Sequence, residues 1–273
     1  MLNEPSICRP TDPGVLLRPL IELIGESGFR GELLKLLNRT CGADHCAIFS
    51  IDGLSPTELA AASLDGTDAA HLGAGIYVRG QFWRRDPTMS AARELGHSES
   101  PNLFRLDIAA LQDTALREIV YPGIGDRLLL TGPTRMGRLA LSILKSGGGN
   151  RFGGAEMTAL TQISLMLLTI VGKHARTVGQ QQGLLRALRS LKDIESSFAC
   201  IAKQIPRRES EVCARYIFGM SSAGIALDLS IGEETVATYR KRLYERLGIC
   251  TQREMFVWYV SSLLKASADQ TAH

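Results

Sequence analysis

IGEETVATYRKRLYERLGI, residues 231–249, is the segment that decides the fold of the carboxyl-terminal part of the chain. At about 100° per residue, Val236, Leu243 and Leu247 fall on one side of a helix that begins near Glu233. The opposite side carries five polar or charged residues, namely Glu234, Thr238, Lys241, Arg242 and Glu245. This pattern predicts a helix with one buried side and one exposed side that carries adjacent cations.

The residues before this segment complete a helix-turn-helix pattern. One helix is predicted to begin at or near Pro206, whose missing N–H costs nothing at the first helical position, and to end at Gly219. Ser221 or Ser222 can cap a short helix through Leu229, and a tight turn then leads into residues 231–249. An exposed helix of this kind can enter a DNA major groove, where cations pair with phosphates and base edges.

Taken alone, Arg240–Arg242 would be interpreted as an ordinary solvated surface. The surrounding residues, however, resemble the carboxyl-terminal DNA-binding domain of the LuxR family of bacterial transcription regulators. The matching positions are Arg208, Glu209, Glu211, Val212, Gly219, Met220, Ser221, Ile225, Ala226, Leu229, Ile231, Thr235, Val236, Leu243, Leu247, Gly248, Ile249 and Arg253. The resemblance implies an all-α, four-helix domain over residues 201–266 that binds double-stranded DNA.

Within this resemblance, the residues expected to contact DNA are Thr235, Thr238, Tyr239, Arg240, Lys241 and Arg242. The sequence departs from the family pattern at three places. Gly224 replaces a Glu that helps to cap the short helix, Ala237 replaces a frequent Lys, and Tyr239 replaces a frequent His. The contacts are therefore expected to shift toward Thr238, Arg240, Lys241 and Arg242.

A last helix is predicted after Thr251, which forms a capping box with Glu254 and precedes the apolar run MFVWYVSSLL. In the resembled family this helix is the dimer contact, which assigns Phe256, Tyr259 and Leu263 to a homodimer interface. The alternative places the aromatic residues of this run in the core of the domain. A two-fold dimer would bind inverted half-sites about one helical turn apart. RNA polymerase is a further partner in keeping with a regulator.

Composition bounds the rest of the chain. With 273 residues and 45% apolar side chains, the chain is long enough for about two domains. The six cysteines are scattered and are interpreted as reduced thiols. The amino terminus lacks the pattern of a signal peptide, and the apolar run 163–171 is about half the length that spans a bilayer. We therefore expect a cytoplasmic protein without a membrane segment.

Residues 13–172 mix predicted helices with short strands. CAIFSI followed by Asp52-Gly53 predicts a strand entering a hairpin, and DRLLLTG and GRLALSILK predict two more strands around the loop PTRM. A helix follows, with apolar residues from Met157 to Val171. This order predicts an α+β domain with an antiparallel sheet, similar to GAF, PAS or autoinducer-binding sensory domains. Residues 173–200 are expected to form a connector, with a solvated helix over 173–195.

One feature of YVRGQFWRRDP resembles the ligand-binding domains of quorum-sensing receptors. Tyr77 lies nine residues before Asp86, and those receptors use a Tyr and an Asp-Pro pair at this spacing to hold the amide and carbonyl groups of the ligand. The Trp that they carry one turn before the Tyr is Gly73 here. Tyr77, Trp83 and Asp86 are thus candidate ligand-binding residues for a small-molecule effector. The alternative makes Trp83 an edge-strand anchor and Asp86 a helix cap.

No pattern of catalytic residues is visible, so we predict neither an enzyme nor a cofactor. CGADHC at 41–46 has metal-ligand residue types without the spaced pairs of a tetrahedral site, and no metal is predicted. The preferred hypothesis is a ligand-responsive, DNA-binding transcription regulator. The alternative is a metabolite-acting or interaction protein with a GAF-like domain, whose carboxyl-terminal helices serve for assembly.

Overall fold

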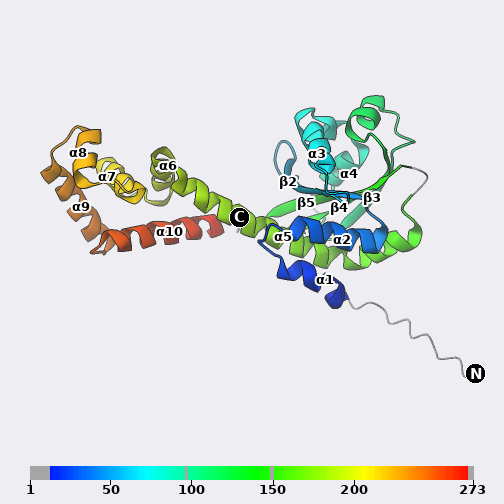
Figure 1. Ribbon diagram of the computed structural model, residues 1–273, viewed down its shortest axis with the longest axis horizontal. Coiled ribbons are helices and arrows are strands. Elements are labelled where there is room, and N and C mark those ends of the chain that lie inside the picture. The colour runs from blue at the N-terminus through cyan, green and yellow to red at the C-terminus, as the bar shows by residue number, and fades with distance from the viewer. Residues whose placement is uncertain (1–12, 96–97, 148–150, 270–273) are drawn as a thin grey trace, which may run out of the picture. The chain divides into compact units, whose positions relative to one another are not determined.

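The computed structural model describes residues 13–95, 98–147 and 151–269. The chain forms two compact units that meet in sequence between Thr177 and Val178 (Figure 1). Each unit has its own hydrophobic core, and each is described by itself below.

A five-stranded antiparallel sheet forms the centre of the amino-terminal unit, as the α+β prediction required. Its order is β2-β1-β5-β4-β3. The strands are β1 (His45–Ser50), β2 (Thr57–Ser63), β3 (Asn102–Asp107), β4 (Ile124–Thr134) and β5 (Gly137–Ser146). The predicted strand CAIFSI is β1, and the two strands around PTRM are β4 and β5, which pair as a hairpin.

Helices cover both faces of this sheet, because alternate residues of each strand point to opposite sides. Ile48 and Leu128 face one core, which also holds α1 (Pro13–Glu22), α2 (Phe29–Cys41) and part of α5 (Gly154–Arg189). Phe49 and Leu129 face the other core, against α3 (Ala69–Arg79) and α4 (Pro87–Glu94). Figure 1 shows α2 and α5 on one side of the sheet and α3 and α4 on the other.

Two short elements complete this unit on the side of α3 and α4. A 3₁₀ turn covers Phe82–Arg84, and a π-helical turn covers Leu116–Val120. The first of these contains Trp83, which is therefore not the edge-strand anchor of the alternative interpretation.

Helix α5 is longer than the sequence pattern indicated. The helix with Met157–Val171 and the first part of the expected connector form one continuous helix from Gly154 to Arg189. It is long and apolar enough to cross a membrane by length and composition alone. Leu160, Leu167 and Leu168 are buried in the core beneath the sheet, so we interpret its apolar side as a core surface.

Five helices after α5 belong to the carboxyl-terminal unit. They are α6 (Leu191–Ile201), α7 (Arg207–Phe218), α8 (Ser222–Leu229), α9 (Glu233–Leu247) and α10 (Gln252–Asp269). The expectation of a solvated helix over 173–195 is wrong for α6. Ser190 breaks the preceding helix and caps α6, and Ile194 and Phe198 are buried in the core shared with α7 and α10.

The helix boundaries in this unit follow from capping residues that the sequence analysis identified. Gly219 ends α7 in the left-handed conformation at φ 98°, where a side chain would be strained. The Ser221 hydroxyl accepts a hydrogen bond from the Gly224 N–H and starts α8. At the start of α10, Thr251 accepts from the Glu254 N–H, while the Glu254 carboxylate accepts from the Cys250 N–H.

His174 ties the turn after α1 to α5 inside the amino-terminal unit. Its ring stacks on Phe29 with centroids 3.7 Å apart, and its Nδ1 accepts a hydrogen bond of 3.0 Å from the Gly25 N–H. The hydrogen bond needs an unprotonated Nδ1, so it requires the neutral ring. Burial lowers the pKa of His174 below its usual value of 6.5.

This depressed pKa predicts a loss of stability in mild acid. Above about pH 6.5 His174 is neutral in the folded and the unfolded chain, whereas below it the unfolded chain binds the proton first. The thermal midpoint of the wild type should therefore fall as the pH drops from 7.5 to 5.5.

The matched control is His174→Asn, which keeps an acceptor near the position of Nδ1 and cannot titrate in this range. Its midpoint should change less over the same pH interval, as measured by differential scanning calorimetry. Equal pH dependence in the two proteins would contradict the role given to His174.

Candidate functional site

Helix α9 is set in place by two buried side chains. Val236 and Leu243, one on each half of the helix, are 0% exposed and contact the core formed by α6, α7, α8 and α10. The helix begins after Gly232 and ends at Gly248, which is left-handed at φ 65°. Glu233 and Glu234 occupy its first turn, where the helix dipole favours negative charge.

A salt bridge fixes the other end of α9. Arg246 lies 3.2 Å from the carboxylate of Glu209 on α7, and Glu209 is only 4% exposed. Arg246 is 44% exposed, but its charge is already paired within the protein.

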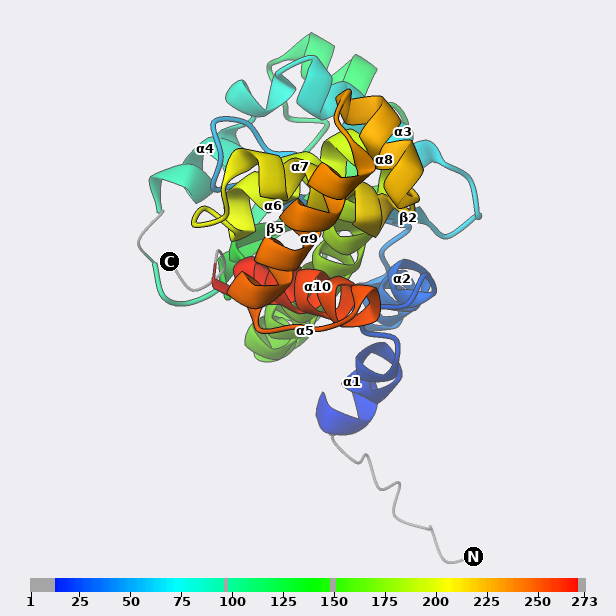
Figure 2. The same cartoon turned by 90° about the vertical axis from the view of Figure 1, so that its left-hand side faces the viewer.

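The side of α9 opposite Val236 and Leu243 is exposed, as predicted. Its exposed residues are Glu234, Thr235, Ala237, Thr238, Lys241, Arg242 and Glu245. Lys241 is 80% exposed and reaches Glu245 only at 4.0 Å. Thr238 bonds back to the Glu234 carbonyl at 2.9 Å. Figure 2 shows α9 along the near side of the carboxyl-terminal unit, between α8 and α10.

Tyr239 and Arg240 lie on the flank of α9 rather than on this side. Both are half-buried: Tyr239 packs against the core, and the Arg240 guanidinium lies 5.6 Å from the centre of the Tyr216 ring. Both residues were expected to contact DNA together with Lys241 and Arg242. The structure separates them, because residues adjacent in sequence are about 100° apart around a helix.

An ion-pair network supports the helices behind α9. Arg215 on α7 is 9% exposed and lies 2.6 Å from Asp228 on α8 and 2.8 Å from Glu195 on α6. No short-range pattern in the sequence indicated these pairs, since the partners are 13 and 20 residues away. The network links three helices through one cation.

The amino-terminal unit contains a pocket of about 290 Å³. It lies between one face of the sheet and α3 with the segment 119–124, on the side of the sheet opposite α2 and α5. Small residues make the space: Ala47 on the sheet and Ala70, Gly73 and Ala74 on α3. The volume is close to the lower end of the range found for small-molecule sites, about 300–1,000 Å³.

Tyr77 and Asp86 are brought together as their spacing suggested. The Tyr77 hydroxyl donates a hydrogen bond of 2.7 Å to Asp86 Oδ2, and both residues are buried. Tyr77 lines the pocket, whereas Asp86 and Trp83 are not among the lining residues. The guanidinium groups of Arg84 and Arg93 instead lie 5.0 and 4.7 Å from the centre of the Trp83 ring.

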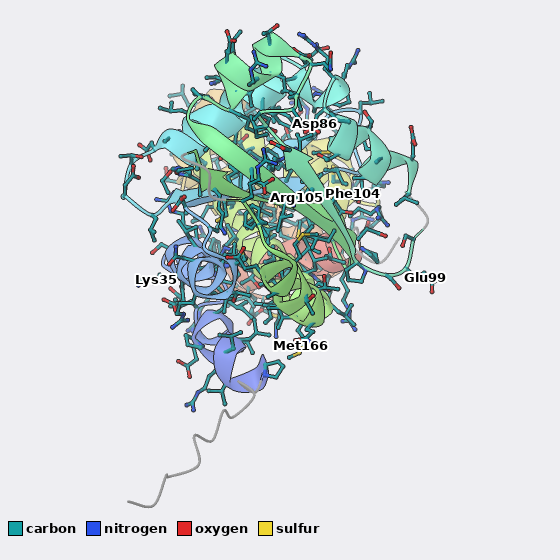
Figure 3. The ribbon with its side chains drawn as sticks, turned by 90° about the vertical axis from the view of Figure 1, so that its right-hand side faces the viewer. Lys35, Asp86, Glu99, Phe104, Arg105 and Met166 are labelled. Atoms are coloured by element: carbon teal, nitrogen blue, oxygen red, sulfur yellow. The ribbon has the colours of Figure 1, made fainter. Side chains whose placement is uncertain are left out.

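Asp86 is the N-cap of α4, as the alternative interpretation proposed. Its Oδ1 accepts hydrogen bonds from the backbone N–H groups of Thr88 and Met89 and from the Thr88 hydroxyl. Its Oδ2 accepts from Arg127 Nη1 as well as from Tyr77. Figure 3 shows Asp86 on the side of the sheet away from Met166 of α5.

Arg127 is the residue of this site that the sequence analysis missed. It lies on β4, is 1% exposed, forms an ion pair with Asp86 and lines the pocket. Burial alone would raise the pKa of Asp86, but the charge of Arg127 and the hydrogen bonds outweigh it and hold that pKa below 3.8. The sequence contains one signal that Arg127 is buried: it directly precedes three leucines in the predicted strand DRLLLTG.

Cys41, at the end of α2, and Cys46, on β1, do not form a reactive or metal-binding cluster. Cys41 and Cys46 are buried, and burial raises the pKa of each thiol to about 12. In the part of the chain that the structure describes, no group of three or more His, Cys, Asp or Glu side chains could hold a metal ion. The five described cysteines are free thiols.

Residues 203–259, which include α7, α8 and α9, match the family described as bacterial regulatory proteins, luxR family. The carboxyl-terminal domain is a LuxR-family helix-turn-helix domain. A protein of Aeromonas salmonicida named as an HTH-type transcriptional regulator in the exeN 3′ region is 33% identical over 79 residues. That match covers 28% of this chain and 40% of the relative's length.

Solved structures with similarity over more of the chain include those of two proteins, VqsR and SdiA. The VqsR LBD domain from Pseudomonas aeruginosa matches 59% of this chain and 95% of its own, with 18% identity and a TM-score of 0.44. Escherichia coli SdiA matches 90% of this chain and 95% of its own, with 14% identity and a TM-score of 0.36. SdiA in complex with octanoyl-rac-glycerol matches 97% and 99%, with 15% identity and a TM-score of 0.39.

The LuxR-family domain tolerates its unusual residue in α8. Gly224 stands where the family carries a Glu, yet Ser221 alone caps the helix, which runs from Ser222 to Leu229.

The last helix of the LuxR-family domain corrects one assignment. Tyr259 is 0% exposed, stacks on Phe198 and donates a hydrogen bond to the Ala187 carbonyl, so it belongs to the core rather than to a dimer interface. Phe256 is 42% exposed and Leu263 is half-buried. Val257 and Leu264, which the sequence analysis did not single out, are also exposed.

The buried ion pair in the amino-terminal unit yields a stability prediction. Asp86→Ala should lower the free energy of unfolding by about 3–5 kcal/mol, because it leaves Arg127 buried without its counter-charge and removes the cap of α4. Denaturant titration, followed by far-ultraviolet circular dichroism, measures this loss.

Thr88→Ala is the matched control, since it removes one hydroxyl partner of Asp86 and keeps both charges. Its cost should be about 1 kcal/mol. An Asp86→Ala protein as stable as Thr88→Ala would show that the ion pair does not hold this unit together.

Proposed function

We propose that this protein is a transcription regulator that binds duplex DNA as a homodimer through α9 and responds to a small molecule held in the amino-terminal pocket. The observation that carries the proposal is the exposed side of α9 in a LuxR-family domain. This side of α9 carries two exposed cations, Lys241 and Arg242, and the hydroxyl groups of Thr235 and Thr238. The setting is the cytoplasm, where bacterial DNA lies.

Charge and shape both support α9 as the DNA-reading element. A helix fits the major groove, which is about 12 Å wide, and adjacent cations gain affinity by releasing counterions from phosphates. The Arg242 guanidinium can donate two hydrogen bonds to one guanine, to O6 and N7, whereas the Lys241 ammonium acts as a single point charge. Arg240 is held against Tyr216 and therefore suits a backbone phosphate at the edge of the groove better than a base.

The acidic first turn of α9 limits how the helix can approach. Glu233 and Glu234 are exposed and would be repelled by phosphates. A base edge that donates, such as the N4 amino group of cytosine, would suit Glu234. We therefore expect the amino-terminal end of α9 to face base edges and not phosphates.

Dimerisation through α10 is part of the proposal. Phe256, Val257 and Leu264 expose 42%, 56% and 46% of their surface on this helix. A self-complementary apolar surface of this kind is what a two-fold interface uses, and two copies would place two α9 helices on inverted half-sites. RNA polymerase is the further partner expected of a regulator that activates transcription.

The DNA-binding role predicts how binding changes when the exposed cations of α9 are removed. Lys241→Ala and Arg242→Ala should each weaken binding of the full chain to its selected duplex about tenfold, measured by fluorescence anisotropy at fixed salt. Loss of a phosphate contact weakens binding to all sequences, whereas loss of a base contact relaxes the preference at one position.

Lys192→Ala on α6 is the matched control, because Lys192 is an exposed cation of the same unit outside α9. It should leave the affinity nearly unchanged. If all three variants bind like the wild type, α9 is not the DNA-reading helix.

The dimer is tested by Phe256→Asp, which places a charge in the proposed apolar interface. The variant should sediment as a monomer at concentrations where the wild type is dimeric, because burying an unpaired carboxylate opposes association. Phe218→Asp is the control, since Phe218 is an equally exposed aromatic residue on α7. A dimeric Phe256→Asp protein would remove α10 from the interface.

A further inference from the structure

The polar end of the pocket shows which chemical group it can receive. Four residues with polar groups line the pocket at this end: Tyr77 from α3, Tyr121 after the π-helical turn, Arg127 from β4 and Ser142 from β5. Arg127 Nε donates to the Ser142 hydroxyl at 2.8 Å, so these two residues form one continuous polar surface. The remainder of the lining is almost wholly apolar.

Asp86 has no capacity left for a ligand. A carboxylate offers about four acceptor positions, and Asp86 already accepts five hydrogen bonds, three at Oδ1 and two at Oδ2. A ligand N–H could reach it only by displacing Arg127, which would leave a buried guanidinium unpaired. The acceptors remaining near this point are the phenol oxygens of Tyr77 and Tyr121, which are neutral and therefore weaker.

The donors of this end, by contrast, are not used up. The hydrogen bonds of Arg127 to described residues use Nε and Nη1, and none of them uses Nη2. The Ser142 oxygen accepts from Arg127, which leaves its own proton able to donate. Arg127 Nη2 on β4 and the Ser142 hydroxyl on β5 are thus the donors available at this end of the pocket. The Asp86 carboxylate is not available there as an acceptor.

Charge decides between a neutral and an anionic head group. Arg127 is already balanced by Asp86, so the buried pair is neutral and a carboxylate would add an uncompensated charge. His45 also lines the pocket, but it lies two strands from Arg127 in the same register, across Leu144, which is roughly 10 Å. It is too far to share the group that Arg127 holds.

From this arrangement we propose that the pocket selects a neutral, apolar molecule whose head is a carbonyl oxygen, bound by Arg127 and Ser142, and does not use a ligand N–H. The inference deepens the proposed ligand response and rests on it. Asp86 acts here as a positioning residue that orients Arg127.

The volume sets the size of the molecule. A cavity of about 290 Å³ equals roughly ten water-sized volumes of about 30 Å³ each, which suits about ten heavy atoms. Methyl octanoate has about this size and ends in a neutral ester. N-methyloctanamide differs from it only by an N–H in place of the ester oxygen, and octanoate supplies the anion.

The test measures the dissociation constants of these three probes for the full chain by isothermal titration calorimetry at neutral pH. Methyl octanoate should bind at least tenfold more tightly than either other probe, because the amide N–H and the carboxylate would be buried without strong partners. An amide or a carboxylate that binds as well as the ester overturns the proposal while leaving the pocket a ligand site. No binding by any probe overturns both.

Arg127→Met separates this mechanism from simple partitioning of apolar molecules. Without Arg127, Asp86 can accept the amide N–H, so the preference for the ester over the amide should shrink or reverse. An unchanged preference overturns the proposal.

If Arg127→Met does not fold, Ser142→Ala provides the second variant, because it removes one donor and keeps the ion pair. It should weaken ester binding about threefold or more at an unchanged thermal midpoint. Unaltered ester affinity in Ser142→Ala overturns the proposal. Ala47→Phe, which fills the pocket from the sheet, should abolish binding of all three probes and shows that they bind there.

Discussion

The burial of Val236 and Leu243 is the interaction on which the carboxyl-terminal unit depends. A helix of 15 residues can bury only one stripe of its surface, and these two side chains decide which stripe it is. Arg246 adds a second restraint through its salt bridge to Glu209. With that side fixed, Thr238, Lys241 and Arg242 must face solvent. The proposed DNA contact is thus a consequence of core packing rather than a separate feature.

In the amino-terminal unit, a buried ion pair has the positioning role that Val236 and Leu243 have in the carboxyl-terminal unit. Arg127 and Asp86 join β4 to the start of α4 inside a core where neither charge could remain alone. The pair also orients the polar end of the pocket, because it leaves donors and removes the carboxylate as an acceptor. One interaction therefore supports the fold and defines the chemistry of the cavity, so substitutions there need a stability measurement beside any binding measurement.

Local patterns in the sequence predicted those features that neighbouring residues determine. The periodicity of α9, the caps at Gly219 and Ser221 and the hairpin strands β4 and β5 depend on residues within one or two turns, and the structure has them in place. Features that join distant residues were not predicted. Arg127 lies 41 residues from Asp86, and α6 enters the core through Ile194 and Phe198, whose partners lie on α7 and α10. Tyr239 and Arg240 lie on the flank of α9 and not beside Lys241, because a run of adjacent residues winds around the helix.

The most direct test of the central claim is a methylation-protection experiment on a duplex selected by the full chain. Guanine N7 lies in the major groove and adenine N3 in the minor groove, so the two positions report the grooves separately. If α9 enters the major groove of each half-site, guanine N7 should be protected in two runs about one helical turn apart, with adenine N3 unaffected between them. A bound complex in which every guanine N7 stays reactive, or in which only adenine N3 is protected, would contradict the account.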